Sequence, residues 1–178
     1  MSTAKLKLGS YISQFNLVSV NGEFYSNNSF SDKKILIIVF SCNHCPYVQA
    51  YEKRLIALQD KFTNDIVIIA INSNDEVGYP EDSFEEMKKR ASKVGFNFPY
   101  LRDESQGVAK SFDATHTPEI FVFDKERKLI FHGKIDDNWQ NENLVKNRYL
   151  ENAIIEYLKD EEISVPETFT IGCTIKWK

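Results

Sequence analysis

Two runs of consecutive apolar residues, 35–40 and 66–71, dominate the first half of the chain. Both are rich in isoleucine and valine, which is typical of strands buried on both faces of a sheet. Between the runs, apolar residues recur with the three- and four-residue spacing of an amphipathic helix. These residues are Val48, Tyr51, Leu55, Leu58 and Phe62. Pro46 suits the first turn of that helix, because the first helical position needs no backbone N–H.

Weaker patterns complete the expected order of elements. Asn21-Gly22 separates two alternating segments, which predicts a tight hairpin near the N-terminus. Residues 119–123 and 128–132 predict a second hairpin, and a short strand is expected at 99–101. Further helices are expected at 81–95, 104–112 and 143–160. This alternation of strands and helices predicts an α/β fold in which helices cover both faces of a mixed central sheet.

Length and composition fit one domain. A chain of 178 residues that is 42% hydrophobic can bury a substantial core, and no linker or repeat interrupts it. We expect a single domain over residues 1–178, with 161–178 as a C-terminal extension packed on it, because the extension is too apolar for a solvated tail. The net charge of −4 argues against nucleic acid and anionic membranes as partners, since binding to phosphates needs clustered Lys and Arg.

The sequence also favours a cytoplasmic location. Residues 1–20 lack the unbroken apolar core and the cleavage site of a signal peptide. The longest apolar run, 35–40, is too short to span a bilayer. The three cysteines do not form the disulfide framework of a small secreted domain.

Cys42 and Cys45 lie where the first buried strand gives way to a helix. A dithiol catalyst needs one thiolate at neutral pH and a second thiol within reach. We expect Cys42 at the N-terminus of the helix, where unpaired N–H groups and the dipole lower the pKa of a thiol, and Cys45 about one turn later. A protonated His44 beside Cys42 would lower that pKa further.

Inert and metal-binding roles for the two cysteines fit the sequence less well. Free cysteines are often small buried hydrophobes, but two at this spacing on a strand-to-helix corner favour redox chemistry. A zinc site needs about four ligands, and the sequence offers no second cluster of Cys or His. Haem attachment does not fit, because Pro46 stands where that motif requires His. We therefore expect no metal and no other cofactor.

Thr117 and Pro118 form a second candidate site directly before the expected strand at 119–123. A cis peptide bond here would leave the backbone of Thr117 free to pair with an extended client beside Cys42. The residues alone favour the trans form, because most X-Pro bonds are trans.

Several segments together resemble the thioredoxin superfamily. Within it, they resemble the redoxin branch (alkyl hydroperoxide reductase/thiol-specific antioxidant) and its peroxiredoxin-like members. The segments are FSCNHCPYV at 40–48, INSND at 71–75, YPEDSF at 79–84, TPEIFVFD at 117–124, HGKIDD at 132–137 and GCTIKW at 172–177. The resemblance implies a thioredoxin-like fold, with Cys42 as nucleophile, Cys45 as resolving thiol and Pro118 in the cis form.

The chain departs from the patterns of these families at three positions. Ser41 stands where thioredoxins usually carry Trp, and Val39 stands where peroxiredoxins carry the Thr that helps to hold the peroxide. His116 replaces a Cys that relatives often have before the Thr-Pro pair. Cys173 is interpreted as a buried structural thiol, and a third redox thiol near Cys42 is the alternative.

These features predict a thiol–disulfide oxidoreductase in which Cys42 and Cys45 act through a mixed disulfide. The alternatives are a thiol-dependent peroxidase and, in another class, a thiol-based metal-binding or redox-sensing module. The expected partners are a disulfide-bearing protein or a small thiol or peroxide substrate, and a cellular thiol reductant.

Overall fold

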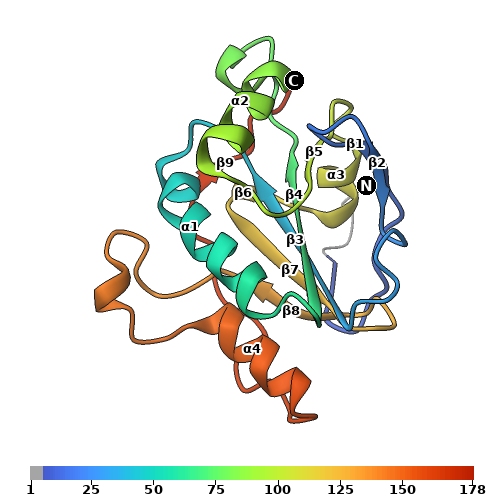
Figure 1. Ribbon diagram of the computed structural model, residues 1–178, viewed down its shortest axis with the longest axis vertical. Coiled ribbons are helices and arrows are strands. Elements are labelled where there is room, and N and C mark those ends of the chain that lie inside the picture. The colour runs from blue at the N-terminus through green and yellow to red at the C-terminus, as the bar shows by residue number, and fades with distance from the viewer. Residues whose placement is uncertain (1–5) are drawn as a thin grey trace.

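A computed structural model describes residues 6–178, in which a five-stranded sheet forms the centre of the molecule (Figure 1). The first five residues, which belong to the segment expected to lack a signal peptide, lie outside this range. The strand order is β5-β4-β3-β7-β8. The strands are β3 (Ile35–Ser41), β4 (Ile66–Asn72), β5 (Tyr100–Arg102), β7 (Glu119–Phe123) and β8 (Leu129–Gly133). Strands β3, β4 and β5 are parallel, whereas β7 pairs antiparallel with both of its neighbours, β3 and β8, so the mixed sheet is confirmed.

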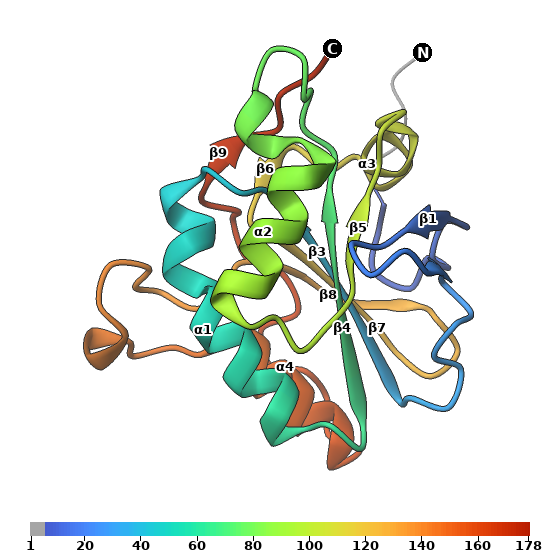
Figure 2. The same cartoon turned by 45° about the horizontal axis from the view of Figure 1, so that its top comes forward.

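Side chains of β3 alternate between two hydrophobic cores, as the period of a strand requires. Ile35, Ile37 and Val39 pack with helices on one face of the sheet, namely α1 (Pro46–Lys61), α2 (Phe84–Val94) and α4 (Tyr149–Leu158). The alternate residues pack on the other face with the short helix α3 (Gly107–Phe112) and residues of the N-terminal hairpin. That hairpin is formed by β1 (Asn16–Val18) and β2 (Phe24–Ser26). Figure 2 shows α1 and α2 together on one side, with α3 and β1 on the other.

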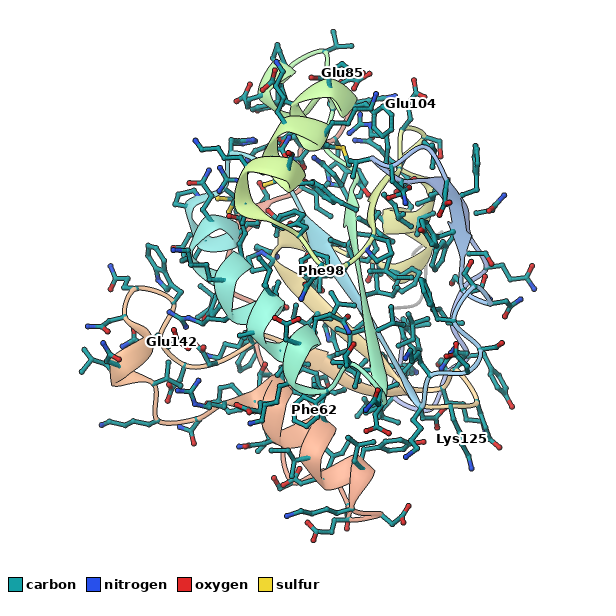
Figure 3. All side chains as sticks on the ribbon, in the orientation of Figure 1. Phe62, Glu85, Phe98, Glu104, Lys125 and Glu142 are labelled. Atoms are coloured by element: carbon teal, nitrogen blue, oxygen red, sulfur yellow. The ribbon has the colours of Figure 1, made fainter. Side chains whose placement is uncertain are left out.

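Three helices, α2, α3 and α4, begin later than the sequence predicts, and α3 begins at Gly107 instead of residue 104. Pro80–Asp82 form a separate 3₁₀ turn, and α2 begins after Ser83, whose hydroxyl caps it by accepting the N–H of Glu86. Before α4, a loop with a 3₁₀ turn at Glu142–Leu144 extends away from the molecule, and Figure 3 labels Glu142 there. Asp137 holds this loop by accepting backbone N–H groups of residues 146 and 147, so the chain cannot be helical from 143.

The C-terminal segment packs on the molecule near the start of α1 (Figure 1). Its strand β9 (Cys173–Thr174) pairs antiparallel with β6 (His116–Thr117), and Ile175 is buried. The sequence predicts the apolar character of this segment but not its pairing, which joins residues more than fifty positions apart. Within residues 6–178, no helix is both long enough and apolar enough to cross a membrane.

Candidate active site

Cys45 is the residue that caps α1, and Cys42 lies three residues earlier, beyond the end of β3. Pro46 occupies the first turn of the helix, so the helix starts one residue after the second cysteine. The expectation that Cys42 lies at the helix N-terminus is therefore wrong. The backbone N–H of Val48, near the start of α1, lowers the pKa of Cys45 instead, although the Cys45 side chain makes no regular capping hydrogen bond.

Thr117 connects the two cysteines to the second candidate segment. The Cys42 sulfur lies 3.5 Å from the Thr117 hydroxyl, and the Cys45 thiol donates a hydrogen bond of 3.3 Å to the Thr117 carbonyl oxygen. The Thr117–Pro118 peptide bond is cis, as the resemblance implies and against the expectation from the residues alone. Both thiols are reduced and nearly inaccessible, with Cys42 2% and Cys45 0% exposed.

The thiols of Cys42 and Cys45 titrate as a pair. Their mutual hydrogen bond lowers the pKa of Cys45 to about 4 and raises the pKa of Cys42. Burial and the charge of Asp82 raise the pKa of Cys42 further, whereas the Thr117 hydroxyl lowers it. In this arrangement the pKa of Cys42 is not lowered as expected, because the first proton lost from the pair leaves a negative charge beside its sulfur.

His44 lies at the edge of the thiol pair and faces a buried carboxylate. Its Nδ1 is 2.6 Å from Oδ2 of Asp82, and its ring stacks on Tyr79 with 5.7 Å between the ring centres. The Asp82 carboxylate offsets the positive charge that a protonated His44 would bring to Cys42. The role of His44 in tuning the pKa of Cys42 therefore stays a prediction.

Asp82 is a site residue that the sequence reasoning did not assign. Its Oδ1 accepts the backbone N–H of Asn43 at 2.6 Å, and its Oδ2 accepts the amide of Asn74 at 2.8 Å. The carboxylate thereby holds the loop that carries both cysteines. The YPEDSF segment contained the signal, but only the fold brings Asp82, 40 positions further on, next to Cys42.

Glu119 holds the cis-proline loop as Asp82 holds the cysteine loop, and the sequence did not predict this role either. One carboxylate oxygen accepts the backbone N–H groups of Thr115 and His116 at 2.8 and 3.0 Å. The other lies 2.7 Å from Nε2 of His132 on the neighbouring strand β8. Burial raises the pKa of Glu119, but the bonds from His132, Thr115 and His116 outweigh it, so the pKa is lowered.

The C-terminal strand occupies the place that we expected a client to take. Cys173 is the register partner of Thr117, so the Thr117 backbone is paired within the chain rather than free. Gly172 lies so close to Thr117 that a Cβ on it would come within 2.2 Å of the Thr117 carbonyl oxygen. The side chain of Cys173 contacts the cluster formed by Cys42, Cys45 and Val48. Cys173 is therefore half-buried beside the dithiol.

Three groups at the site have the spacing of metal ligands. The sulfur of Cys42, a ring nitrogen of His44 and a carboxylate oxygen of Asp82 lie within 4.8 Å of one another. Such atoms bind zinc, but Asp82 already accepts hydrogen bonds from Asn43 and Asn74. A metal ion would have to compete with these contacts, and the expected absence of a metal stays a prediction.

Solved structures similar to this chain share its fold. One is an uncharacterized conserved protein from Geobacillus kaustophilus, with 36% identity, a TM-score of 0.92, and coverage of 98% of this chain and 94% of the other. A hypothetical protein from Sinorhizobium meliloti 1021 has 33% identity, a TM-score of 0.92, and coverage of 98% and 96%. The peroxidoxin BcpB of Mycobacterium tuberculosis, at 20% identity and a TM-score of 0.59 over 70% of this chain and 83% of its own, supports the fold alone.

The sequence itself identifies the family. No curated protein matches the chain, but the model of the AhpC/TSA family matches residues 8–132. That range contains both cysteines of the pair, the cis-proline and the central sheet apart from the last residue of β8. The chain therefore belongs to the AhpC/TSA family of redoxins, which supports an oxidoreductase function based on thiols.

Proposed function

We propose that the protein is a thiol–disulfide oxidoreductase that uses Cys42 as nucleophile and Cys45 as resolving thiol. One observation carries the proposal: the sulfurs of Cys42 and Cys45 both contact Thr117, at 3.5 Å from its hydroxyl and 3.3 Å from its carbonyl oxygen, and the two side chains pack together in one buried cluster. Two cysteine side chains packed together in this way can form a disulfide with little movement of the backbone. The arrangement therefore suits a pair that alternates between dithiol and disulfide.

The shared proton prepares Cys42 for attack. In the half-ionised pair, the Cys42 thiol donates a hydrogen bond to the Cys45 thiolate. When a client disulfide approaches Cys42, that proton passes to Cys45, and the Cys42 sulfur attacks the nearer sulfur of the client. The client bond breaks, a Cys42–client mixed disulfide forms, and the other client sulfur leaves as a thiolate.

Cys45 completes the cycle. Its thiol loses the proton again, attacks Cys42 and releases the second client sulfur, which leaves a Cys42–Cys45 disulfide. His44 contacts Asp82 and keeps 28% of its side chain exposed, so it offers a route for that proton from the site to solvent. A cellular thiol reductant returns the disulfide to the dithiol.

Burial of the dithiol limits the client. Cys42 is 2% exposed and β9 lies beside Thr117, so a folded client cannot bring a disulfide to the sulfur without displacing the C-terminal strand. The favoured substrates are a small disulfide or an extended segment that replaces β9. Both belong to the expected class of disulfide-bearing partners.

Reduction of insulin disulfides and of a small aromatic disulfide by the full chain tests the proposal. Cys42→Ser is expected to lose at least about a hundredfold of either activity, because no other thiol starts the reaction. Cys45→Ser is expected to accumulate a mixed disulfide with the client, detectable as an adduct by intact mass. Full activity in Cys42→Ser would overturn the proposal.

A thiol peroxidase is the second candidate, and Thr117 favours it. Val39 is fully buried and has no hydroxyl, but the Thr117 hydroxyl approaches the Cys42 sulfur from another segment. Cys42 would attack the O–O bond and become a sulfenic acid while the other peroxide oxygen leaves as water or an alcohol, and the sulfenic acid would then condense with Cys45, releasing a water molecule. Peroxide consumption with excess dithiothreitol decides the matter. A rate equal to that of the free reductant would reject this candidate.

A further inference from the structure

The C-terminal strand brings a third thiol to the dithiol in a fixed position. The backbone N–H of Ile175 donates to the Thr115 carbonyl at 2.9 Å, and that of Lys176 donates to the Asn74 side chain at 2.9 Å. Ile175 itself is 3% exposed, so the strand is anchored by burial as well as by hydrogen bonds. Gly172 allows the close approach to Thr117, because any side chain there would collide with its carbonyl. Cys173 is therefore held beside the site on a packed strand.

Cys45 interacts with both of the other thiols. The side chain of Cys173 packs against the cluster that contains Cys42 and Cys45. The thiols of Cys42 and Cys173 each favour the thiolate of Cys45, and so does the backbone N–H of Cys173. Cys45 thus has two neighbouring thiols as possible disulfide partners.

We propose that Cys173 exchanges with the oxidised pair: its thiolate attacks the Cys45 sulfur, a Cys45–Cys173 bond forms, and Cys42 leaves as a thiolate. The inference rests on the proposed function, because it begins from the Cys42–Cys45 disulfide. One disulfide is exchanged for another, so no external oxidant or reductant is needed, and the proton lost by Cys173 is regained by Cys42. The exchange moves the oxidation away from the sulfur that meets the client.

The charge of Cys45 determines when Cys173 can act as a nucleophile. In the reduced protein, burial and the neighbouring Cys45 thiolate raise the pKa of Cys173 to about 11, whereas Lys176 lowers it. Once Cys45 is part of a disulfide it carries no charge and no longer raises the pKa of Cys173, whereas Lys176 still lowers that pKa. Cys173 therefore becomes a better nucleophile once Cys42 and Cys45 are joined.

Oxidation of the full chain with one equivalent of diamide, quenched with acid and alkylated, tests the inference by peptide mapping. Trypsin places Cys42 and Cys45 together in peptide 35–53 and Cys173 in peptide 160–176. The wild type is expected to give a cross-link between these peptides with Cys42 alkylated. Cys42→Ser is expected to keep the cross-link, and Cys45→Ser is expected to lose it.

A matched control tests whether the exchange needs a thiol that faces Cys45 or only a thiol on the same strand. Thr174 is exposed, and neighbouring residues of a strand point to opposite faces, so Cys173→Ser combined with Thr174→Cys moves the thiol away from Cys45. This double variant is expected to reduce the cross-link at least about tenfold, since exchange needs an oriented thiol.

The outcomes distinguish this inference from the function on which it rests. An oxidised wild type with only the Cys42–Cys45 disulfide, or a double variant that cross-links as well as wild type, would overturn the exchange. In either case, loss of disulfide reduction in Cys42→Ser would leave the proposed function intact. Full reduction activity in Cys42→Ser would reject the proposed function, whatever the peptide map gives.

Discussion

Two histidine–carboxylate pairs support the site from opposite sides, and they differ in burial. His44 lies 2.6 Å from Asp82 and keeps 28% of its side chain exposed, whereas His132 lies 2.7 Å from Glu119 and keeps only 5%. Each carboxylate also accepts backbone N–H groups, Asp82 from the cysteine loop and Glu119 from the cis-proline loop. The same combination of side chains, a histidine and a carboxylate, thus fixes each of the two loops that meet where Cys42 contacts Thr117.

The difference shows why a histidine beside a carboxylate does not define a catalytic group. His132 is buried in the sheet with its ring tilted against that of Phe121, so its pair is a structural support. His44 has a ring nitrogen within 4.8 Å of the Cys42 sulfur and is partly exposed, and a role for it at the reacting centre stays a prediction. Exposure and the distance to sulfur separate the two roles.

The largest expected effect is a loss of stability when the buried pair of Glu119 and His132 is broken. Glu119→Ala removes the partner of the Nε2 atom of His132 and the acceptor of the N–H groups of residues 115 and 116, which is expected to cost about 3–5 kcal/mol of unfolding free energy. Urea denaturation measures the loss. Glu119→Gln is the matched control, because its carbonyl oxygen can still accept the two backbone bonds. A loss below about 1 kcal/mol in Glu119→Ala would contradict the supporting role.

The pH dependence of stability sharpens the same comparison. The pKa of Glu119 is lowered in the folded protein, so between that pKa and about 4.3 the unfolded chain binds more protons. Its contribution is therefore complete above about pH 5 and is lost as the pH falls through the folded pKa, by about 1.4 kcal/mol for each unit of lowering. Urea denaturation from pH 6 to pH 3 should show a smaller loss in Glu119→Gln. Equal losses in the wild type and in Glu119→Gln would show that groups other than Glu119 cause the loss of stability at low pH.

The smallest expected effect is a change in the reactivity of Cys42 when the Asp82 carboxylate, the partner of His44, is made neutral. Asp82→Asn removes the negative charge that raises the pKa of Cys42, so more of this thiol is ionised at pH 7. Alkylation of Cys42 should become about threefold to tenfold faster, since one unit of pKa corresponds to a tenfold change in thiolate. Peptide mapping after timed treatment with iodoacetamide measures the rate at Cys42 alone. Unchanged or slower alkylation would show that Asp82 does not act on Cys42 through its charge.

The fold shows where local patterns suffice. The runs at 35–40 and 66–71 predict β3 and β4 because both faces of the strands are buried, and the apolar spacing after Pro46 predicts α1. The starts of α2 and α4 were predicted too early, because Ser83 caps one helix and Asp137 holds the loop before the other. Such contacts involve single polar side chains and leave no periodic trace.

The sequence alone determined that two cysteines lie at a strand-to-helix corner, because spacing and periodicity are local properties of the chain. The expectation that the helix supports Cys42 was wrong although Pro46 takes its expected place, because Cys45 and not Cys42 is then the residue directly before the helix. The tertiary structure decided the rest. Asp82 and Cys173 reach the thiols, and Glu119 reaches the cis-proline loop, through packing and strand pairing that no local pattern encodes.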